Sequence, residues 1–239
     1  CEGLTTTLTH PTAGGTWTSS DPTIASIGIG TGVVTGVSAT PAPGTATITY
    51  TLPSGCFTTM TFTVLPTPGA ITGTLALCQS QTATLSSSTV GGTWSSGTTT
   101  VATIDASTGL WTAIGTGTST ITYTSAAGCI TTAVVTVNGI PSAITGPGSV
   151  CVGQTITLSS ATPMGAWSSS TPAVGTISGS GDVTGITAGT TDITYALASG
   201  CYVTKTVTVN AGPNPITGTP LGICVGASTF LSCTTPGGI

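Results

Sequence analysis

Charged side chains are almost absent from this chain of 239 residues. They make up 3% of the sequence, whereas ordinary soluble domains carry about 25%. Lys205 is the only lysine or arginine, so the basic surface that binding to nucleic acid phosphates requires is excluded. The net charge of −4 leaves little repulsion between copies of the chain. Such a surface favours a protein that packs against itself.

Long apolar runs are also missing, and we expect no signal peptide within this segment. No stretch of 18 or more consecutive apolar residues occurs, so we expect no membrane insertion in this segment. The opening CEGLTTTLTH has no basic region of the kind that begins a signal peptide. Threonine, in contrast, supplies about a quarter of all residues, several times its ordinary share. The surface is therefore expected to be covered by Thr, Ser, Gly and Ala.

What the chain does contain is a repeat. Each copy has a first cysteine, a tryptophan sixteen residues later, and a second cysteine with a tyrosine six residues before it. A period of 73 to 77 residues with landmarks in a fixed order indicates one folded unit used several times. The landmarks are Cys1, Trp17, Tyr50 and Cys56; Cys78, Trp94, Tyr123 and Cys129; and Cys151, Trp167, Tyr195 and Cys201, with a fourth copy opening at Cys224.

The repeat divides the chain into four parts. We predict repeat 1 at 1–66, repeat 2 at 67–139, repeat 3 at 140–212 and the start of a fourth repeat at 213–239. The linkers are short and contain proline, which stiffens a joint, so we expect a semi-rigid rod of domains stacked end to end. Their sequences are VLPTPGAITG (64–73), VNGIPSAITG (137–146) and VNAGPNPITG (209–218).

Repeat 1 lacks the ITG segment that precedes the first cysteine in the later copies. We therefore expect its first strand to be missing and the chain to be one window on a longer polypeptide. The alternative is strand addition, in which the ITG segment at 216–218 of one chain completes the first domain of the next.

Short runs of alternating apolar and hydroxyl residues predict an all-β unit. No run shows the 3.6-residue period of a helix over a helical length. Six or seven short strands in each copy predict a two-sheet sandwich, with the tryptophan and tyrosine landmarks in its core. In repeat 3 the runs are TITLSS (155–160), GAWSSS (165–170), VGTIS (174–178), DVTGI (182–186), TDITYAL (191–197) and CYVTKTVTVN (201–210).

Trp111 stands apart from the other tryptophans. It occupies the place of Val34 and Val183 in the aligned copies, so it belongs to one repeat only. Core or edge variation is favoured over a role in contacts with a ligand. We expect its removal to cost less stability than removal of Trp94.

Eight cysteines in a chain of such low charge indicate an oxidising, extracellular or cell-surface location. Their even placement predicts disulfides within repeats, namely Cys1–Cys56, Cys78–Cys129 and Cys151–Cys201. The rival pairing is Cys56–Cys78, since both lie near one junction. Cys224 is expected to pair with a residue outside the segment, and Cys233 has no counterpart. Metal binding is disfavoured, because no Cys-x-x-Cys pair occurs and His10 is the only histidine.

The remaining polar residues form no recurrent catalytic or metal-binding set. Asp21, Asp105, Asp182 and Asp192 are the candidates for calcium, but the copies do not repeat a cluster of acidic ligands. His10 has no nucleophile with which it can be paired on this evidence. We therefore expect no enzymatic activity, no metal and no cofactor.

At the level of whole motifs the chain resembles a known family. GTWTSSDPTIASIGIGTGVVTGVS, GTATITYTLPSGC and TFTVLP in repeat 1 resemble the bacterial immunoglobulin-like domain of group 2. The ITG segments, the first cysteines and KTVTVN resemble tandem repeats in very long secreted surface proteins of Bacteroidetes-type bacteria. The resemblance implies an extracellular array of immunoglobulin-like β-sandwich domains and supplies no catalytic residues. The tyrosine lies six residues before the second cysteine instead of two, so we expect the disulfide at one pole of the domain.

Three functions fit these observations. The first is a structural component of an extracellular filament or fibre, formed by self-association through backbone edges and Thr/Ser-lined faces. The second is the stalk of a cell-surface adhesin whose binding tip lies outside this segment. The third is a spacer beside an enzyme domain. The uniform copies and the low charge favour the filament, and the sequence names no surface ligand.

Overall fold

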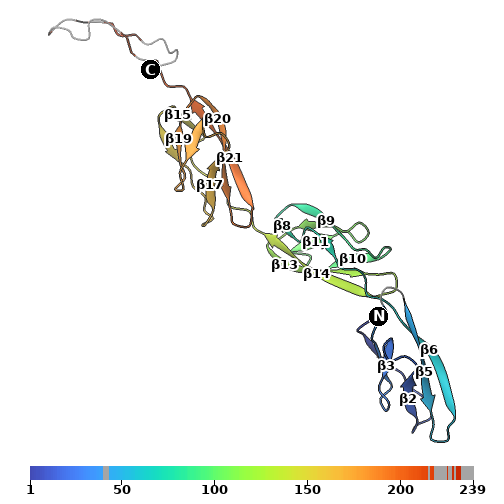
Figure 1. Ribbon diagram of the computed structural model, residues 1–239. Coiled ribbons are helices and arrows are strands. Elements are labelled where there is room, and N and C mark those ends of the chain that lie inside the picture. Colours follow the sequence, from blue (N-terminus) through green and yellow to red (C-terminus); the bar gives the residue numbers. More distant parts are fainter. Residues whose placement is uncertain (40–42, 215, 218–224, 226–227, 229, 233–239) are drawn as a thin grey trace. The chain divides into compact units, whose positions relative to one another are not determined.

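The computed structural model describes residues 1–39, 43–214, 216–217, 225, 228 and 230–232. Every regular element in this part of the chain is a β-strand, as predicted (Figure 1). None of the described residues forms a helix that is long and apolar enough to cross a membrane. The chain divides into two compact units, Cys1–Gly139 and Ile140–Ile239. The first unit holds repeats 1 and 2 together.

Repeat 1 is built from two three-stranded antiparallel sheets. One sheet has the order β1-β4-β3 and the other the order β2-β5-β6. Their strands are β1 (Thr5–Thr7), β4 (Val33–Gly36) and β3 (Ala25–Ile27), and β2 (Thr16–Ser19), β5 (Gly44–Thr51) and β6 (Phe57–Val64).

Repeat 2 has the same two sheets, each with one strand more. The orders are β10-β13-β14-β8 and β11-β12-β9-β7, and β8 runs parallel to β14. The strands are β10 (Thr93–Ser96), β13 (Gly117–Thr124), β14 (Ile130–Asn138) and β8 (Ala76–Cys78), and β11 (Ala102–Ile104), β12 (Leu110–Ala113), β9 (Thr82–Ser86) and β7 (Thr72–Gly73).

Repeat 3 forms the second unit with the same plan. The orders are β15-β21-β20-β17 and β16-β19-β18, and β15 runs parallel to β21. The strands are β15 (Ser149–Cys151), β21 (Tyr202–Asn210), β20 (Gly189–Ala196) and β17 (Ala166–Ser169), and β16 (Thr155–Thr157), β19 (Asp182–Gly185) and β18 (Gly175–Ile177).

The core of each sandwich follows from the two-residue period of its strands. In β13, Ser119, Ile121 and Tyr123 point inward and are buried, while the threonines between them are more exposed. Because successive side chains of a strand face opposite sides, this alternation buries one face and leaves hydroxyls on the other. The same positions in β5 and β20 are buried in repeats 1 and 3.

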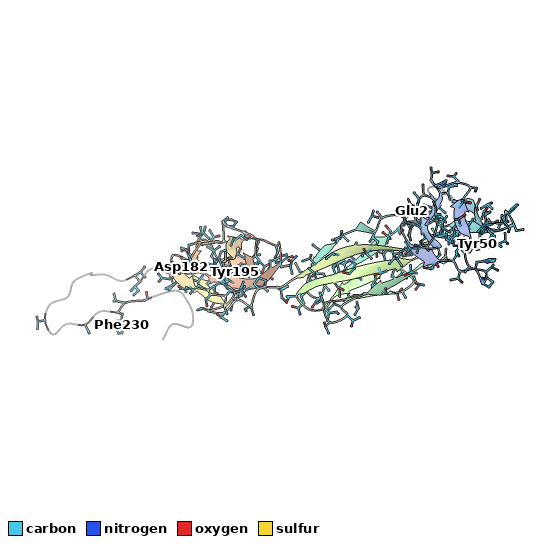
Figure 2. All side chains as sticks on the ribbon, turned by 90° about the horizontal axis from the view of Figure 1, so that it is seen from below. Glu2, Tyr50, Asp182, Tyr195 and Phe230 are labelled. Carbon is cyan, nitrogen blue, oxygen red and sulfur yellow. A yellow bond between two sulfur atoms is a disulfide. The ribbon has the colours of Figure 1, made fainter. Side chains whose placement is uncertain are left out.

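The tryptophan and tyrosine landmarks form a cross-strand pair in every repeat. Trp17 lies opposite Tyr50, Trp94 opposite Tyr123 and Trp167 opposite Tyr195. The ring centroids lie 4.6 Å apart in each pair, with tilted planes. This geometry is favourable for aromatic pairs. All three tyrosines and Trp94 are buried, whereas Trp17 and Trp167 are half-buried. Figure 2 labels Tyr50 of repeat 1 and Tyr195 of repeat 3 among the side chains of the described residues.

Each landmark tyrosine also locks the loop before the tryptophan strand. In repeat 2 the Tyr123 hydroxyl donates to the Thr89 carbonyl over 2.5 Å and accepts the Gly92 N–H over 2.8 Å. Repeats 1 and 3 make the same two bonds from Tyr50 and Tyr195. Glycine is required at Gly92, because a Cβ there would collide with the tyrosine ring and the Thr124 carbonyl.

Trp111 is the largest fully buried side chain of the described residues, with 0% exposure against 7% for Trp94. Its Nε1–H donates to the Thr74 carbonyl over 3.1 Å. Across β12 and β9 it lies opposite Ala83, whereas repeat 3 pairs Val183 with Ile156. A large residue opposite a small one fills the space that two medium residues fill elsewhere. This burial removes the reason to expect Trp111 to contribute less than Trp94.

The ITG segments pair at the edge of one sheet of each later repeat, and in repeat 2 this edge strand is β7, beside β9. Thr72 pairs with Ser86, Thr145 with Ser159 and Thr217 with Ser232. Ile71 and Ile144 of these segments are buried in the cores of their repeats. Among the described residues of repeat 1, β1 has no such neighbour, and all three of its residues are exposed. Thr217 forms backbone hydrogen bonds with Ser232 of its own chain, which disfavours exchange of that segment between chains.

We predict that Tyr123→Phe lowers the free energy of unfolding of the first unit by about 1–3 kcal/mol. The change removes one hydroxyl and leaves the Gly92 N–H and the Thr89 carbonyl without their partner. Urea unfolding measures the loss. The control is Tyr202→Phe, whose side chain is exposed and should change little. Equal losses in the two variants would contradict the lock.

We predict that Trp111→Ala and Trp94→Ala each cost about 3–5 kcal/mol, as large core deletions do. The double variant Trp111→Val/Ala83→Ile reproduces the Val183–Ile156 pair of repeat 3. It should recover most of the stability that Trp111→Val loses. Urea unfolding of the parent and the four variants gives the comparison. A Trp111→Ala variant as stable as the parent would show that the buried indole contributes nothing.

Candidate functional site at the repeat junction

The second cysteine of each repeat closes the long hairpin of the sandwich. In repeat 2 the hairpin is β13–β14, and the Ser125 N–H donates to the Cys129 carbonyl over 2.8 Å. Gly128 takes a positive φ of 82° in this turn, which glycine adopts readily. In the same way, the Leu52 N–H donates a hydrogen bond to the Cys56 carbonyl, and the Leu197 N–H donates one to the Cys201 carbonyl. All three second cysteines therefore lie at the hairpin tip.

The first cysteine of each repeat lies at the opposite pole. In repeat 1 the residue after it, Glu2, donates its N–H to the Leu65 carbonyl over 2.9 Å, just beyond the end of β6. Gln79 makes the same bond to Asn138, and Val152 makes it to Asn210. Hydrogen bonds between the beginning and the end of each repeat therefore hold its first cysteine beside the end of its last strand.

The two cysteines of one repeat are too far apart to be bonded. The eight residues of β6 separate the poles of repeat 1, which at ~3.4 Å per residue is about 24 Å. A disulfide requires Cα atoms about 4.4–6.8 Å apart. Repeats 2 and 3 separate their poles by strands of nine residues. The fold thus excludes a bond between first and second cysteines of the same sandwich.

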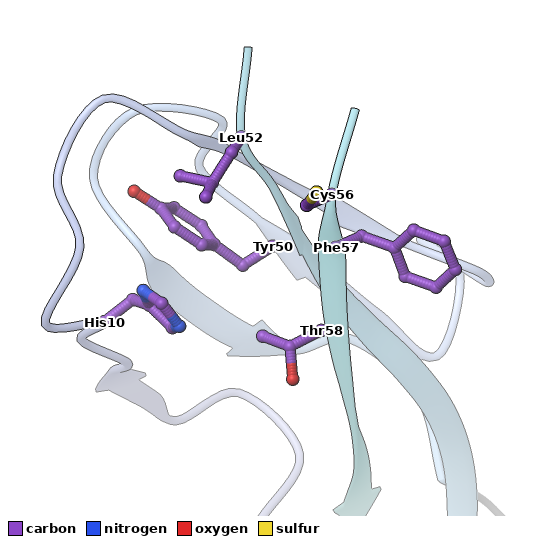
Figure 3. Close-up of a pocket in the computed structure, with 6 residues that line it drawn as sticks. All are labelled: His10, Tyr50, Leu52, Cys56, Phe57 and Thr58. Carbon is purple, nitrogen blue, oxygen red and sulfur yellow. The ribbon is translucent and has the colours of Figure 1, made fainter. Parts of the chain in front are cut away.

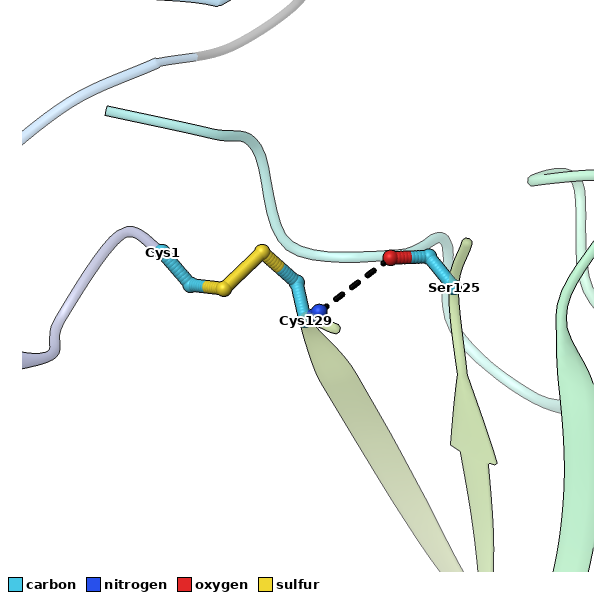
Figure 4. The surroundings of a disulfide bond; sticks show 3 residues. All are labelled: Cys1, Ser125 and Cys129. Atoms are coloured by element: carbon cyan, nitrogen blue, oxygen red, sulfur yellow. Dashed lines mark hydrogen bonds between the residues drawn. A yellow bond between two sulfur atoms is a disulfide. The ribbon is translucent and has the colours of Figure 1, made fainter. Parts of the chain in front are cut away.

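The disulfide that forms joins successive repeats. Cys1 of repeat 1 is bonded to Cys129 of repeat 2, with their Cα atoms 5.5 Å apart (Figure 4). The predicted pairing Cys1–Cys56 is therefore wrong, and so is Cys78–Cys129. Cys56 and Cys151 are free and exposed, which also overturns Cys151–Cys201 and the rival Cys56–Cys78.

The other cysteines complete this account. Cys78 and Cys201 are each disulfide-bonded. Cys224 and Cys233 lie outside the described residues, and with them the expected partner of Cys224. Even spacing along the sequence fits pairing within a repeat and pairing between repeats equally well. Only the positions of the poles distinguish the two.

Small and apolar side chains predominate near the disulfide, together with the Ser125 hydroxyl. Cys129 is fully buried, and its N–H donates to the Ser125 Oγ over 3.2 Å (Figure 4). A shallow pocket beside it is lined by Leu65 and Pro66 of repeat 1 and by Ala126 and Ala127 of repeat 2. The end of repeat 1 therefore lies against the hairpin tip of repeat 2. The bond and these contacts together define what we call the junction.

The aspartates considered for calcium stabilise turns and strand pairs instead. Asp105 accepts four hydrogen bonds from the backbone and side chains of Ser107 and Thr108. These bonds, those from Thr108 first, hold the pKa of Asp105 well below its usual value. Asp21 and Asp182 also have lowered pKa values, mainly through hydroxyls of Thr23 and Thr157.

No metal-binding cluster emerges from these acids. Across the part of the chain that the structure describes, no group of three or more His, Cys, Asp or Glu side chains is placed to hold a metal ion. Asp192 accepts a hydrogen bond from the Thr206 hydroxyl across β20 and β21 over 2.6 Å. The carboxylates are therefore used in local structure.

His10 lies at the hairpin-tip pole of repeat 1. Its ring stacks on Tyr50 with centroids 4.6 Å apart. Together they line a small pocket with Leu52, Cys56, Phe57 and Thr58 (Figure 3). Sequence reasoning did not find this pocket, because His10 and Cys56 are 46 residues apart and only the fold brings their loops to one pole.

The fold and the junction define the class: an all-β array of immunoglobulin-like sandwich domains. Solved structures with similar folds include bacterial surface proteins. A C-terminal fragment of intimin, in complex with the intimin-binding domain of its translocated receptor, is 21% identical with a TM-score of 0.34, over 53% of each chain. Invasin, a bacterial integrin-binding protein, is 17% identical with a TM-score of 0.44, over 87% of this chain and 55% of invasin.

The S-layer protein SbsC is 18% identical with a TM-score of 0.29, over 85% of this chain and 36% of SbsC. The chain thus spans about a third to a half of the length of these structures. A scan against protein-family models finds no match, and a search among curated proteins also finds none. At these identities and TM-scores the similarities carry no conclusion about the role or the ligands of this chain.

We predict that stability falls as the pH drops below about 4. The folded pKa of Asp105 lies below the unfolded value, so its contribution is present above the unfolded pKa and is lost as the pH falls towards the folded pKa. Urea midpoints measured between about pH 2 and pH 7 should show a shallower acid slope for Asp105→Asn than for the parent. Identical slopes would contradict a role for this carboxylate.

We predict that the cross-repeat disulfide withholds chain length under force. The 128-residue separation of Cys1 and Cys129 corresponds to about 45 nm at ~3.5 Å per residue. Single-molecule pulling on the ends of the chain should release this length only after reduction. A Cys129→Ser variant should release only the part of this length that precedes Cys78 without reductant, about 27 nm at ~3.5 Å per residue, because the disulfide of Cys78 still holds the remainder. Full extension of the oxidised parent would show that repeats 1 and 2 are not bonded.

Proposed function

We propose that the chain is a structural segment of an extracellular filament or fibre built from tandem immunoglobulin-like domains. The observation that carries this proposal is the Cys1–Cys129 bond between successive repeats. A disulfide within a domain stabilises that domain, whereas this one fastens one domain to the next. The junction therefore transmits tension through a second covalent path beside the linker.

The location follows from the same bond. Disulfides form and persist in oxidising environments and are rare in the cytosol. Cys1, Cys129, Cys78 and Cys201 are all oxidised. The chain is extracellular or at the cell surface.

Self-association is supported by the character of the surface. With 3% charged residues, like-charge repulsion between neighbouring chains is weak. The outer face of the last long strand carries exposed apolar side chains in each repeat: Phe57, Ile130 and Val134, and Tyr202. The β1 edge of repeat 1 offers unpaired backbone groups among the described residues. These features favour lateral contact between chains without a cofactor.

The proposal assigns no catalytic role to this segment. His10 stacks on Tyr50, and Asp105 and Asp192 are engaged by neighbouring hydroxyls. Groups that could perform acid–base chemistry are thus used in packing and turns. The adhesin stalk uses the same joints but requires the chains to remain separate.

Electron microscopy separates the filament from the stalk. We expect the native material to form fibres of constant width with an axial repeat. Isolated flexible strings would support the stalk and contradict the filament. The variant Cys1→Ser/Cys129→Ser serves as the matched control, since it removes the junction bond and leaves each sandwich intact. Its fibres should be less straight than those of the parent, or absent.

A further inference from the structure

The sheet that contains the long hairpin carries the same row of hydroxyls on its outer face in every repeat. Strand pairing places three side chains of each row next to one another, one from the tryptophan strand and one from each strand of the hairpin. They alternate with the inward-facing residues of their strands and therefore point away from the core. We call these sets the hydroxyl rows: Thr18, Thr49 and Thr59; Ser95, Thr122 and Thr132; and Ser168, Thr194 and Thr204.

The hydroxyls of these rows are left available by the fold. Within the part of the chain that the structure describes, none of them forms a hydrogen bond with another side chain. The outer face of the other sheet differs, since in repeat 3 Thr155 bonds Thr184 and the Thr157 hydroxyl donates to Asp182. A hydroxyl can donate one hydrogen bond and accept others. Each row can therefore bond to water or to a partner.

Charge is almost excluded from the outer face of the hairpin sheets. Among the described strands of these sheets, Asp192 is the only charged residue on that face, and the Thr206 hydroxyl donates to it over 2.6 Å. Lys205 lies on the other side of β21 and donates to the Gly146 carbonyl. Exposed sheet surfaces ordinarily use charged side chains to keep copies apart. Here an exposed apolar side chain stands next to each row instead: Phe57, Ile130 and Tyr202.

The size of this face limits what one repeat can hold. A residue in a sheet covers about 16 Å² of its face, at ~3.4 Å along the strand and ~4.8 Å across it. The eight residues of β13 and the nine of β14, with the shorter β10 and β8, therefore present about 400 Å². A stable interface buries about 1,200–2,000 Å² over both partners. One repeat against one repeat falls short of this, so several repeats must engage at once.

A second copy of the chain is the partner that can engage several rows together. Because a hydroxyl both donates and accepts, one row is complementary to another. Thr59, Thr132 and Thr204 each stand three residues after the second cysteine of their repeat, so the rows recur with the period of the chain. A second copy has the same period, whereas a partner of a different period meets one row at a time. Weak contacts that are linked in this way reinforce one another.

We propose that chains associate side by side through the hydroxyl rows, each row lying against a row of a second copy. This inference rests on the proposed filament and supplies its lateral contact. The apolar side chains next to the rows are buried in the same contact. A charged side chain placed in the rows is then brought against its own kind across the contact, and like charges that face each other are destabilising.

The test compares two variants of the full chain that carry the same added charge. The row variant is Thr59→Glu/Thr132→Glu/Thr204→Glu. The control variant is Thr5→Glu/Thr82→Glu/Thr155→Glu, whose three positions are exposed on the other sheet of each repeat. Both lower the net charge by three. Sedimentation velocity measures association, electron microscopy measures the width of the fibres, and urea unfolding verifies that both variants fold as the parent does.

We expect the row variant to need about tenfold more protein than the parent for half-maximal association, which corresponds to about 1.4 kcal/mol. The control variant should associate as the parent does. A second measurement needs no substitution. Hydroxyl-radical footprinting of the parent should show Tyr202 protected in the associated material, while Met164, an exposed residue in the loop before β17, stays reactive.

Three results would overturn the inference. One is equal weakening of both variants, which would reveal a general effect of charge. Another is fibres of parental width from the row variant, with Tyr202 unprotected in the parent; this result leaves the proposed filament standing. The third is binding of the parent to cellulose that the row variant loses while its self-association is unchanged, which would assign the face to a polysaccharide. A parent that does not associate at all would contradict the filament itself.

Discussion

The length of one β-hairpin governs the organisation of this protein. A strand of eight or nine residues separates the first and second cysteines of every repeat. A disulfide reaches less than a third of that distance. The cysteines of one sandwich can therefore be oxidised only with partners outside it, and Cys1–Cys129 is such a bond. In a small secreted domain a disulfide ordinarily joins two parts of the same domain. Here the disulfide joins one domain to the next.

This choice leaves each sandwich to be stabilised by its own packing. The Trp–Tyr pair provides much of this packing, because the two large rings lie against each other. The tyrosine hydroxyl also forms hydrogen bonds with two backbone groups of the preceding loop. Around it the copies vary while their volume is kept, as Trp111 opposite Ala83 and Val183 opposite Ile156 show. Hydroxyl side chains replace charges in the turns and along the exposed faces. The resulting surface is polar enough for water and weakly repulsive towards another copy.

Sequence reasoning reached the fold and failed at the disulfides. Alternation in runs such as GTSTITYT depends only on neighbouring residues, so the strands and the inward-facing tyrosines were predictable. The Cys1–Cys129 pairing was not predictable, because the spacing of the cysteines along the sequence does not show at which end of the sandwich each one lies. Trp111 was underrated for a related reason: alignment shows that it differs from valine, but only the opposite strand shows the alanine that makes room for it.

The sequence by itself determined the repeat, the all-β class and the oxidising location, because period, alternation and composition are local or cumulative properties of the chain. Tertiary structure decided which cysteines meet, which remain free, and that His10 shares a pocket with Cys56. These depend on where strands end and which loops share a pole. That information arises only when residues far apart in the chain are packed into the same sandwich or against the next one.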